Sequence, residues 1–267
     1  MKKKLLIIGT NSLLYSIFKN GNFKDYDAIS HKDVDNINYK NYEIILLLSF
    51  DPELHKTKIN ISSSIEKTIC MKIKQHNNHL IYMSSSRVYE NNQSIDLHEE
   101  LKINPNNLTK YAFNKKIIED YFINTLKDQC TILRLSNILH SKKYCHNKKT
   151  FMCTFYENLS NGFIKMPSNS FKKDFIDESN FIIVLTNIIE NYNTFSGIYN
   201  FGSGKYLTNE NFISTANNCG VSKLIIGDET FSFFLNVKKI TNKTSIEFNQ
   251  DILIKNCISK KPIGRLS

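Results

Sequence analysis

The sequence predicts an α/β protein built on a doubly wound parallel sheet, and two patterns support this. Short, almost continuously apolar runs recur along the first half of the chain, as expected for strands buried on both faces. Segments with helical spacing lie between those runs, and strands that alternate with helices are typical of parallel sheets. Of the 267 residues, 41% are hydrophobic and 22% are charged, which is enough apolar material for a buried core.

Five strands are expected before residue 136, at 5–8, 26–30, 43–48, 80–83 and 131–135. Helical spacing predicts three helices among them, over 13–18, 61–75 and 108–126. Further along, the pattern predicts a polar loop over 141–150, helices near 154–160, 179–190 and 209–217, and a strand at 199–201.

No proline- or glycine-rich linker divides the chain, so we expect residues 1–267 to form a single compact unit. Within it, residues 1–140 and 173–204 are assigned to the main sheet. A smaller C-terminal lobe is expected from residues 141–172 and 205–267.

The balance of charge is basic, with 35 Lys and Arg against 25 Asp and Glu. A net charge of +10 can indicate nucleic acid, an anionic surface or a phosphorylated substrate as the partner. The lysines are scattered and no nucleic-acid-binding module is recognisable, so we expect no nucleic-acid partner.

The six cysteines form no CxxC pair, and no Cys/His group has the spacing of a zinc motif. We therefore expect free thiols, a reduced cytoplasmic location and no metal. The longest apolar runs, 44–48 and 181–185, are far shorter than the ~20 residues of a membrane helix, so no membrane insertion is expected.

Residues that could bind a cofactor or take part in catalysis lie at the ends of three expected elements. Gly9 ends the first strand before a helix, where α/β folds place a dinucleotide pyrophosphate, although Ser12 and Tyr15 replace the later glycines of a GxxGxxG pattern. On this evidence alone, an ordinary strand-to-helix turn is the alternative. Tyr111 and Lys115 are four apart and hence share one helical face, and serines 84–86 follow the strand at 80–83.

Taken together, these residues resemble the extended short-chain dehydrogenase/reductase superfamily, which contains nucleotide-sugar epimerases, dehydratases and reductases. The resemblance spans residues 4 to about 215. Within the superfamily, the sequence is most similar to the small 4-keto-sugar reductases. Four further segments match in order: Glu100 and Pro105 before Tyr111 with Glu119 after it, Leu133-Arg134-Leu135-Ser136-Asn137, Lys173-Asp174-Phe175-Ile176, and Gly197-Ile198-Tyr199-Asn200-Phe201-Gly202-Ser203-Gly204.

The resemblance implies a Rossmann-like fold with a substrate-binding C-terminal lobe, and a homodimer through the helices at 61–75 and 108–126. Tyr111 would be the general acid or base, and Lys115 would lower the pKa of a phenol that ordinarily titrates near ~10. Ser85 would bind the substrate oxygen. The implied cofactor-binding residues are Gly9, Asn11, Ser12, Leu13, Ser30, His31, Lys32, Leu48, Ser49, Met83, Lys115 and Leu135. The implied substrate-binding residues are Ser85, Ser86, Arg87, Asn137, Lys142 and Lys143, with Lys148 and Lys149 expected near the diphosphate.

Two departures from the family pattern bear on which reaction and which cofactor are expected. Ser86 and Arg87 stand where the dehydratases carry Asp-Glu, which argues against a 4,6-dehydratase. The hydroxyl and basic groups of Ser30, His31 and Lys32 favour NADP over NAD. NAD is the alternative if the strand ends closer to Asp33, because an acidic residue at that point binds the ribose hydroxyls of NAD.

The resulting prediction is an NAD(P)H-dependent reductase of a nucleotide-linked keto-sugar at C4, in surface polysaccharide or deoxysugar biosynthesis of a bacterium. An NAD-dependent nucleotide-sugar epimerase is the alternative, because it would use the same residues. A catalytically weakened NADP-binding protein of the same fold is the third possibility, since two glycines of the pattern are missing.

Overall fold

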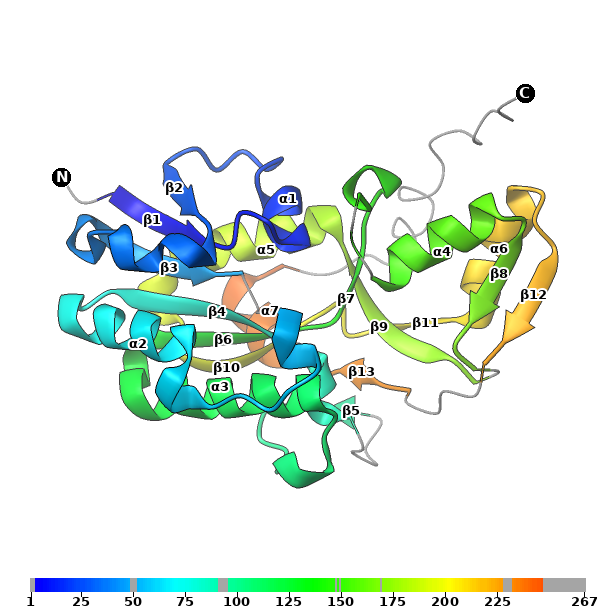
Figure 1. Cartoon of the computed structure of the whole chain (residues 1–267). Coiled ribbons are helices and arrows are strands. Elements are labelled where there is room, and N and C mark those ends of the chain that lie inside the picture. Colours follow the sequence, from blue (N-terminus) through cyan, green and yellow to red (C-terminus); the bar gives the residue numbers. More distant parts are fainter. Residues whose placement is uncertain are drawn as a thin grey trace.

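A six-stranded, fully parallel sheet lies at the centre of the protein, in the order β10-β6-β4-β3-β1-β2 (Figure 1). The computed structural model describes residues 3–48, 52–90, 96–146, 148, 150–168, 170–227 and 232–246. The strands of this sheet are β1 (Lys3–Ile8), β2 (Tyr26–Ile29), β3 (Tyr42–Leu47), β4 (His79–Ser85), β6 (Cys130–Leu135) and β10 (Gly197–Phe201). The predicted fold class is confirmed.

The apolar runs form strands because both faces of the sheet are covered. On β1, Leu5 and Ile7 belong to one hydrophobic core, whereas Leu6 and Ile8 belong to the core on the opposite face. Adjacent side chains alternate between the faces of a strand, so a strand buried on both sides has no polar position.

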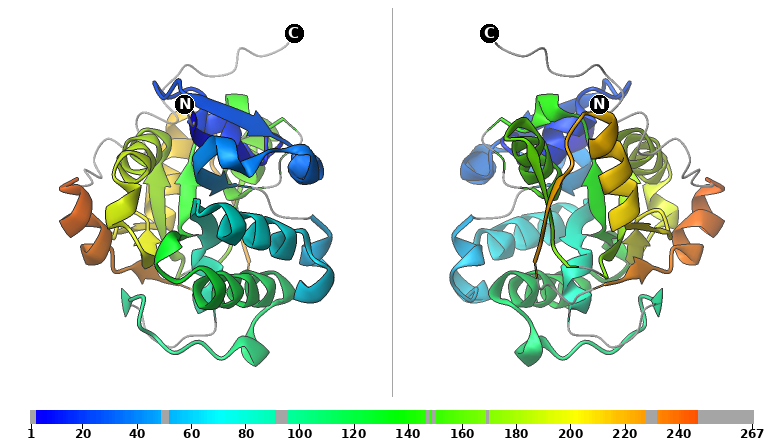
Figure 2. Two further views of the ribbon diagram at one scale, coloured as in Figure 1. Left: turned by 90° about the vertical axis from the view of Figure 1, so that its left-hand side faces the viewer. Right: turned by 90° about the vertical axis from the view of Figure 1, so that its right-hand side faces the viewer.

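Helices pack on both faces of the sheet. The first core includes side chains of α1 (Leu13–Phe18), α5 (Glu178–Glu190) and α7 (Lys238–Thr244). The second includes α2 (Ile65–His76) and α3 (Lys110–Leu126), which lie side by side in Figures 1 and 2. This is the doubly wound arrangement that the sequence predicts.

Side-chain caps fix where three helices begin, and they move these starts away from the predicted ones. Ser64 accepts a hydrogen bond from the amide of Lys67 (3.3 Å), so α2 starts at residue 65 instead of 61. Thr109 caps α3 in the same way, and Thr150 accepts from the amide of Cys153 (3.2 Å) at the start of α4 (Phe151–Ser160). The predicted starts at residues 61 and 108 precede the caps, whereas the predicted start at 154 lies within α4, because apolar periodicity alone does not locate a cap.

A second group of elements lies beyond the carboxyl ends of the main strands. β7 (Asn137–Leu139), β9 (Lys172–Asp177) and β11 (Tyr206–Thr208) form a three-stranded sheet, and β8 (Phe163–Met166) pairs with β12 (Lys223–Ile226). Together with α4 and α6 (Asn209–Asn218) they enclose an aromatic core around Phe155, Phe171, Phe175 and Phe212. β9 thus lies in this group, whereas residues 173–204 are predicted from the sequence to belong to the main sheet.

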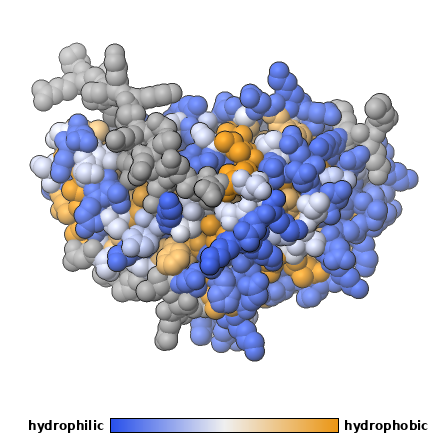
Figure 3. All heavy atoms as spheres, turned by 180° about the vertical axis from the view of Figure 1, so that it is seen from behind, coloured by the Kyte–Doolittle hydropathy of each residue, from blue (hydrophilic) through white to orange (hydrophobic). Residues whose placement is uncertain are grey.

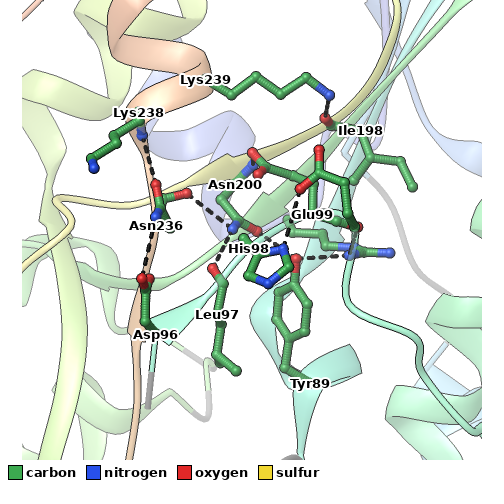
Figure 4. A network of polar contacts seen from close by, with 12 residues as sticks. Tyr89, Asp96, Leu97, His98, Glu99, Ile198, Asn200, Asn236, Lys238 and Lys239 are labelled. Atoms are coloured by element: carbon green, nitrogen blue, oxygen red, sulfur yellow. Dashed lines mark hydrogen bonds and ion pairs between the residues drawn. The ribbon is translucent and has the colours of Figure 1, made fainter. Parts of the chain in front are cut away.

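A buried polar network ties the segment after β4 to the edge of the sheet (Figure 4). The guanidinium of Arg134 on β6 pairs with the carboxylate of Glu119 on α3 (2.8 Å) and donates to the hydroxyl of Tyr89 (2.7 Å). That hydroxyl donates to Asn200 on β10, whose amide donates to the carbonyl of Leu97 in β5 (Asp96–Leu97). β5 pairs with β13 (Phe234–Leu235), so the network connects the segment after β4 with α3, β6, β10 and the β5–β13 pair.

On the side turned away in Figure 1, the described residues form no large apolar area. Figure 3 shows that this side is mainly hydrophilic, with apolar atoms in small separate patches. Within the described parts of the chain, none of the helices has both the length and the apolarity to cross a membrane.

Candidate active site

A cavity of about 340 Å³ opens at the carboxyl ends of the main strands. In an open α/β sheet, ligands bind at these ends, close to the point where the strand order reverses. Here the order reverses between β1 and β3. The predicted site residues that line the cavity are Leu13, Leu48, Met83, Ser85, Tyr111, Lys115, Leu135 and Asn137.

The hydroxyls of Tyr111 and Ser85 meet at this cavity and form a hydrogen bond. Ser85 ends β4, and Tyr111 lies in the first turn of α3, just after the Thr109 cap. Burial raises the pKa of the Tyr111 phenol, while the Ser85 hydroxyl and the Arg87 guanidinium act in the opposite direction. The phenol is therefore protonated at neutral pH and can donate its proton.

Lys115 lies one helical turn beyond Tyr111, with its side chain only 4% exposed. Its ammonium donates to the carbonyl of Met83 (2.9 Å) and lies 4.7 Å from the centre of the Tyr82 ring. Burial lowers the pKa of Lys115 to about 7, against the opposing effect of the carboxylates of Glu66 and Glu119. The Lys115 ammonium thus points to the Met83 carbonyl. The groups that oppose the rise in the pKa of the Tyr111 phenol are Ser85 and Arg87.

Two residues that the sequence did not indicate complete the surroundings of Tyr111. The ring of His55, in a short 3₁₀ helix (Pro52–His55), stacks on the Tyr111 ring at 4.7 Å and 5°. Burial and the nearby Lys115 lower the pKa of His55. Asn114 holds this segment through hydrogen bonds with Leu54 (2.6 Å), Thr57 (2.7 Å) and Ile59 (2.8 Å).

The turn after β1 forms with a single glycine. Gly9 has φ +122, a conformation that residues with a side chain rarely adopt, and its amide donates to the carbonyl of Ile29 in β2. Ser12 caps α1 by accepting from the amide of Tyr15 (3.0 Å). The Tyr15 side chain is partly buried and packs against the hydrophobic core on this face of the sheet.

The remaining predicted cofactor residues surround this turn. Lys148 donates to the carbonyl of Asn11, which joins the 141–150 loop to the turn. Ser30 follows β2 and accepts from the amide of Lys32 (3.3 Å), and His31 opens the next 3₁₀ helix. Because Ile8 pairs with Ile29, the end of β2, and with it Ser30, lies beside Gly9. Ser49 lies outside the described residues.

Comparison with known proteins identifies the fold. No protein-family model matches the sequence, and a search of curated proteins finds no match either. Among solved structures, a UDP-N-acetylglucosamine 4-epimerase from Bacillus cereus aligns with a TM-score of 0.74 and 17% identity over 97% of this chain and 98% of that one. The fold is that of nucleotide-sugar epimerases and dehydratases.

Two further structures with this fold match over similar lengths. A UDP-N-acetylglucosamine 4-epimerase from Methanobrevibacter ruminantium, in complex with UDP-N-acetylmuramic acid, gives a TM-score of 0.76 and 15% identity over 97% of this chain and 98% of that one. The dTDP-glucose 4,6-dehydratase from Bacillus anthracis, in complex with NAD, gives 0.73 and 12% over 96% of this chain and 95% of that one.

Four of the predicted substrate residues are not among those that line the cavity of about 340 Å³. Ser86 is buried, and Arg87 forms an ion pair with Glu90 (2.8 Å). Lys142 donates to the hydroxyl of Ser160 (3.1 Å), and the Lys143 ammonium lies over a neighbouring tyrosine ring.

Two of the basic residues of the 141–150 loop line a second cavity, of about 400 Å³. Lys142 and Lys148 both line it, whereas Lys149 lies outside the described residues. The path of a polar loop cannot be deduced from its composition, so the sequence could not show which of its lysines face a ligand.

Proposed function

We propose that the protein belongs to the extended short-chain dehydrogenase/reductase superfamily and is an NADP(H)-dependent reductase of a nucleotide-linked keto-sugar. The observation that carries the proposal is the meeting of Ser85, Tyr111 and Lys115 at one cavity at the carboxyl ends of parallel strands. The epimerase-like fold supports it.

The two hydroxyls suit protonation of a carbonyl oxygen. An oxygen held between Ser85 and Tyr111 would accept a hydrogen bond from each, and the protonated phenol would give up its proton as negative charge develops. A nicotinamide cofactor, when bound, supplies the hydride. Lys115 faces the same cavity, where its ammonium can bind ribose hydroxyls.

The residues around Gly9 fit a dinucleotide. The positive φ of Gly9 and the small Ser12 leave the backbone of the turn open to a pyrophosphate, and Lys148 adds a positive charge beside it. Ser30, His31 and Lys32 would bind the 2′-phosphate of NADP. NAD is the alternative, because the Bacillus anthracis neighbour holds NAD.

A nucleotide diphosphate sugar fits the charge distribution next to the cavity. Asn137 lines the cavity and is fixed by donating to the carbonyl of Asp174 (3.1 Å). Lys142 and Lys148 gather at the adjoining 400 Å³ cavity, where two phosphate charges would be compensated. We place the reaction in the cytoplasm, in the biosynthesis of surface polysaccharides or deoxysugars.

An NAD-dependent epimerase is the second candidate, because two of the matching structures are UDP-N-acetylglucosamine 4-epimerases. It would use the same three residues but would keep its cofactor bound. Mass spectrometry of the nucleotide released by denaturing the purified protein separates the two. Tightly bound NAD favours the epimerase, and an exchangeable NADPH site favours the reductase.

The direct test is NADPH oxidation with nucleotide-linked 4-keto-6-deoxy sugars. We expect turnover by the wild type and a lower kcat for Ser85→Ala, which loses one hydrogen bond to the oxygen but keeps the proton donor. Binding of NADPH without turnover of any keto-sugar or epimerisation of any nucleotide sugar would leave only the binding-protein alternative.

We also propose a homodimer through α2 and α3. These helices lie side by side, and Met71 on α2 is 51% exposed, which would give the interface an apolar contact. Light scattering should give twice the chain mass for the wild type and the mass of one chain for Met71→Glu. A monomeric wild type at micromolar concentration would contradict the proposal.

A further inference from the structure

Three side chains with metal-binding atoms meet in the wall between the two cavities. His140 follows β7, Cys145 follows a short 3₁₀ helix (Lys142–Tyr144), and Cys153 lies in the first turn of α4. One ligand atom from each lies within 4.8 Å of the other two, and the Cys153 sulfur is 4.0 Å from Nε2 of His140. Zinc bonds of ~2.3 Å to sulfur and ~2.0 Å to nitrogen place tetrahedral ligands about 3.5–3.8 Å apart, so only small shifts are needed.

The imidazole of His140 is oriented for this purpose. The side chain is fully buried, and Nδ1 lies 3.1 Å from the carbonyl oxygen of Ser141. A carbonyl only accepts, so Nδ1 carries the proton and the lone pair of Nε2 faces the sulfur of Cys153. Metal-ligating histidines commonly have their second nitrogen fixed by such a backbone hydrogen bond.

The two thiols are free and adjacent, and each belongs to a different segment. The Thr150 hydroxyl lies 3.1 Å from the Cys153 sulfur and 3.2 Å from Nε2 of His140, so it would have to rotate away for an ion to bind both ligands. A cation that converts the thiols to thiolates would release their protons.

We propose that His140, Cys145 and Cys153 form a site for zinc or a similar soft divalent cation. Two sulfur ligands and one imidazole select such ions over magnesium or calcium. Both cysteines line the 400 Å³ cavity, from which a water molecule can supply the fourth ligand.

The bound ion would close the chain between residues 140 and 153 into a loop. Lys148 lies in that loop and donates to the carbonyl of Asn11, so the ion would hold the loop against the turn after β1. The role is therefore structural, and it does not depend on the proposed reaction.

The main competing chemistry is a disulfide between Cys145 and Cys153, which would consume both sulfur ligands and leave His140 alone. The buried, oriented imidazole favours the metal, because a disulfide has no use for it. The intervals of four and seven residues between the ligands match no short zinc motif. They meet only because α4 turns back beside β7.

The test is titration of metal-free, reduced protein with Co²⁺, a spectroscopic substitute for zinc. We expect one equivalent to bind, with a thiolate-to-cobalt charge-transfer band and the visible absorption of a tetrahedral site. Cys145→Ser and Cys153→Ser should each lose roughly half of the charge-transfer intensity, because one thiolate of two remains, and should weaken binding at least 10-fold. Cys219→Ser, an exposed cysteine at the end of α6, is the matched control and should behave as the wild type.

A second measurement uses the wild type alone, in case the buried variants unfold. Zn²⁺ should protect Cys145 and Cys153, but not Cys219, from alkylation detected by mass spectrometry of peptides. Cobalt spectra without a thiolate band, or equal alkylation with and without Zn²⁺, would overturn the proposal. So would a Cys145–Cys153 disulfide as the main form of protein prepared without added oxidant.

Discussion

Replacement of Lys115 by methionine should stabilise the protein at neutral pH while removing a cavity group. In the wild type, burial lowers the pKa of Lys115 from its ordinary 10.5 to about 7. Between these values the unfolded chain holds a proton that the folded protein has lost. The folded state is therefore penalised at pH 7, and its stability rises as the pH rises toward 10.5.

Linkage gives the size of the effect. The penalty for placing this ammonium in the fold is about 4 kcal/mol at pH 7 and about 2 kcal/mol at pH 9. Methionine has a similar length and no proton to lose, but it forfeits the hydrogen bond to the Met83 carbonyl, worth about 1 kcal/mol. Lys115→Met should then be about 3 kcal/mol more stable than the wild type at pH 7, and this advantage should shrink by about 2 kcal/mol at pH 9.

The assay is urea unfolding followed by far-UV circular dichroism at pH 7, 8 and 9 on both proteins. Lys67→Met on α2 is the control, because its side chain is exposed, and its difference from the wild type should stay the same across this range. A difference between Lys115→Met and the wild type that does not change from pH 7 to 9 would refute the reasoning.

Three other changes test separate parts of the site. Asn114→Ala breaks three hydrogen bonds to the segment that carries His55, so urea unfolding should show a loss of about 3 kcal/mol. Lys148→Ala should raise KM more than it lowers kcat, since it removes charge beside the turn after β1; an unchanged KM would make this lysine a surface residue. Calorimetry should show tighter binding of NADPH than NADH, and Lys32→Glu should reverse that order; tighter NADH binding by the wild type would contradict the preference for NADP.

The main sheet could be predicted because its signal is local. The run Leu5, Leu6, Ile7 and Ile8 is apolar at every position, and only a strand between two helical layers requires that. The shortest strands could not be found in this way. β7 has three residues and β5 has two, so neither shows a periodicity, and their positions follow from pairing with segments far along the chain.

The candidate site likewise contains residues that local sequence patterns predict and residues that only the tertiary structure reveals. Tyr111 and Lys115 share a face through helical geometry, and Ser85 reaches the cavity because it ends a central strand. The stacking of His55 on Tyr111 joins residues 56 positions apart, through a segment without a periodic pattern. Lys142 is predicted near the substrate; it lines the second cavity, a direction that loop composition does not specify.

The role of the Tyr111 proton is tested most directly by comparing kcat for Tyr111→Phe and the wild type with a nucleotide-linked keto-sugar and NADPH. The variant keeps the ring, and with it the stacking on His55, but has no proton to transfer. General acid catalysis contributes about 10²–10⁴-fold, so kcat should fall by that factor while NADPH affinity stays within about twofold. Tyr121→Phe makes the same change on α3 at a position that does not line the cavity, and should keep wild-type kcat. Reduction by Tyr111→Phe at the wild-type rate would show that this phenol is not the proton donor.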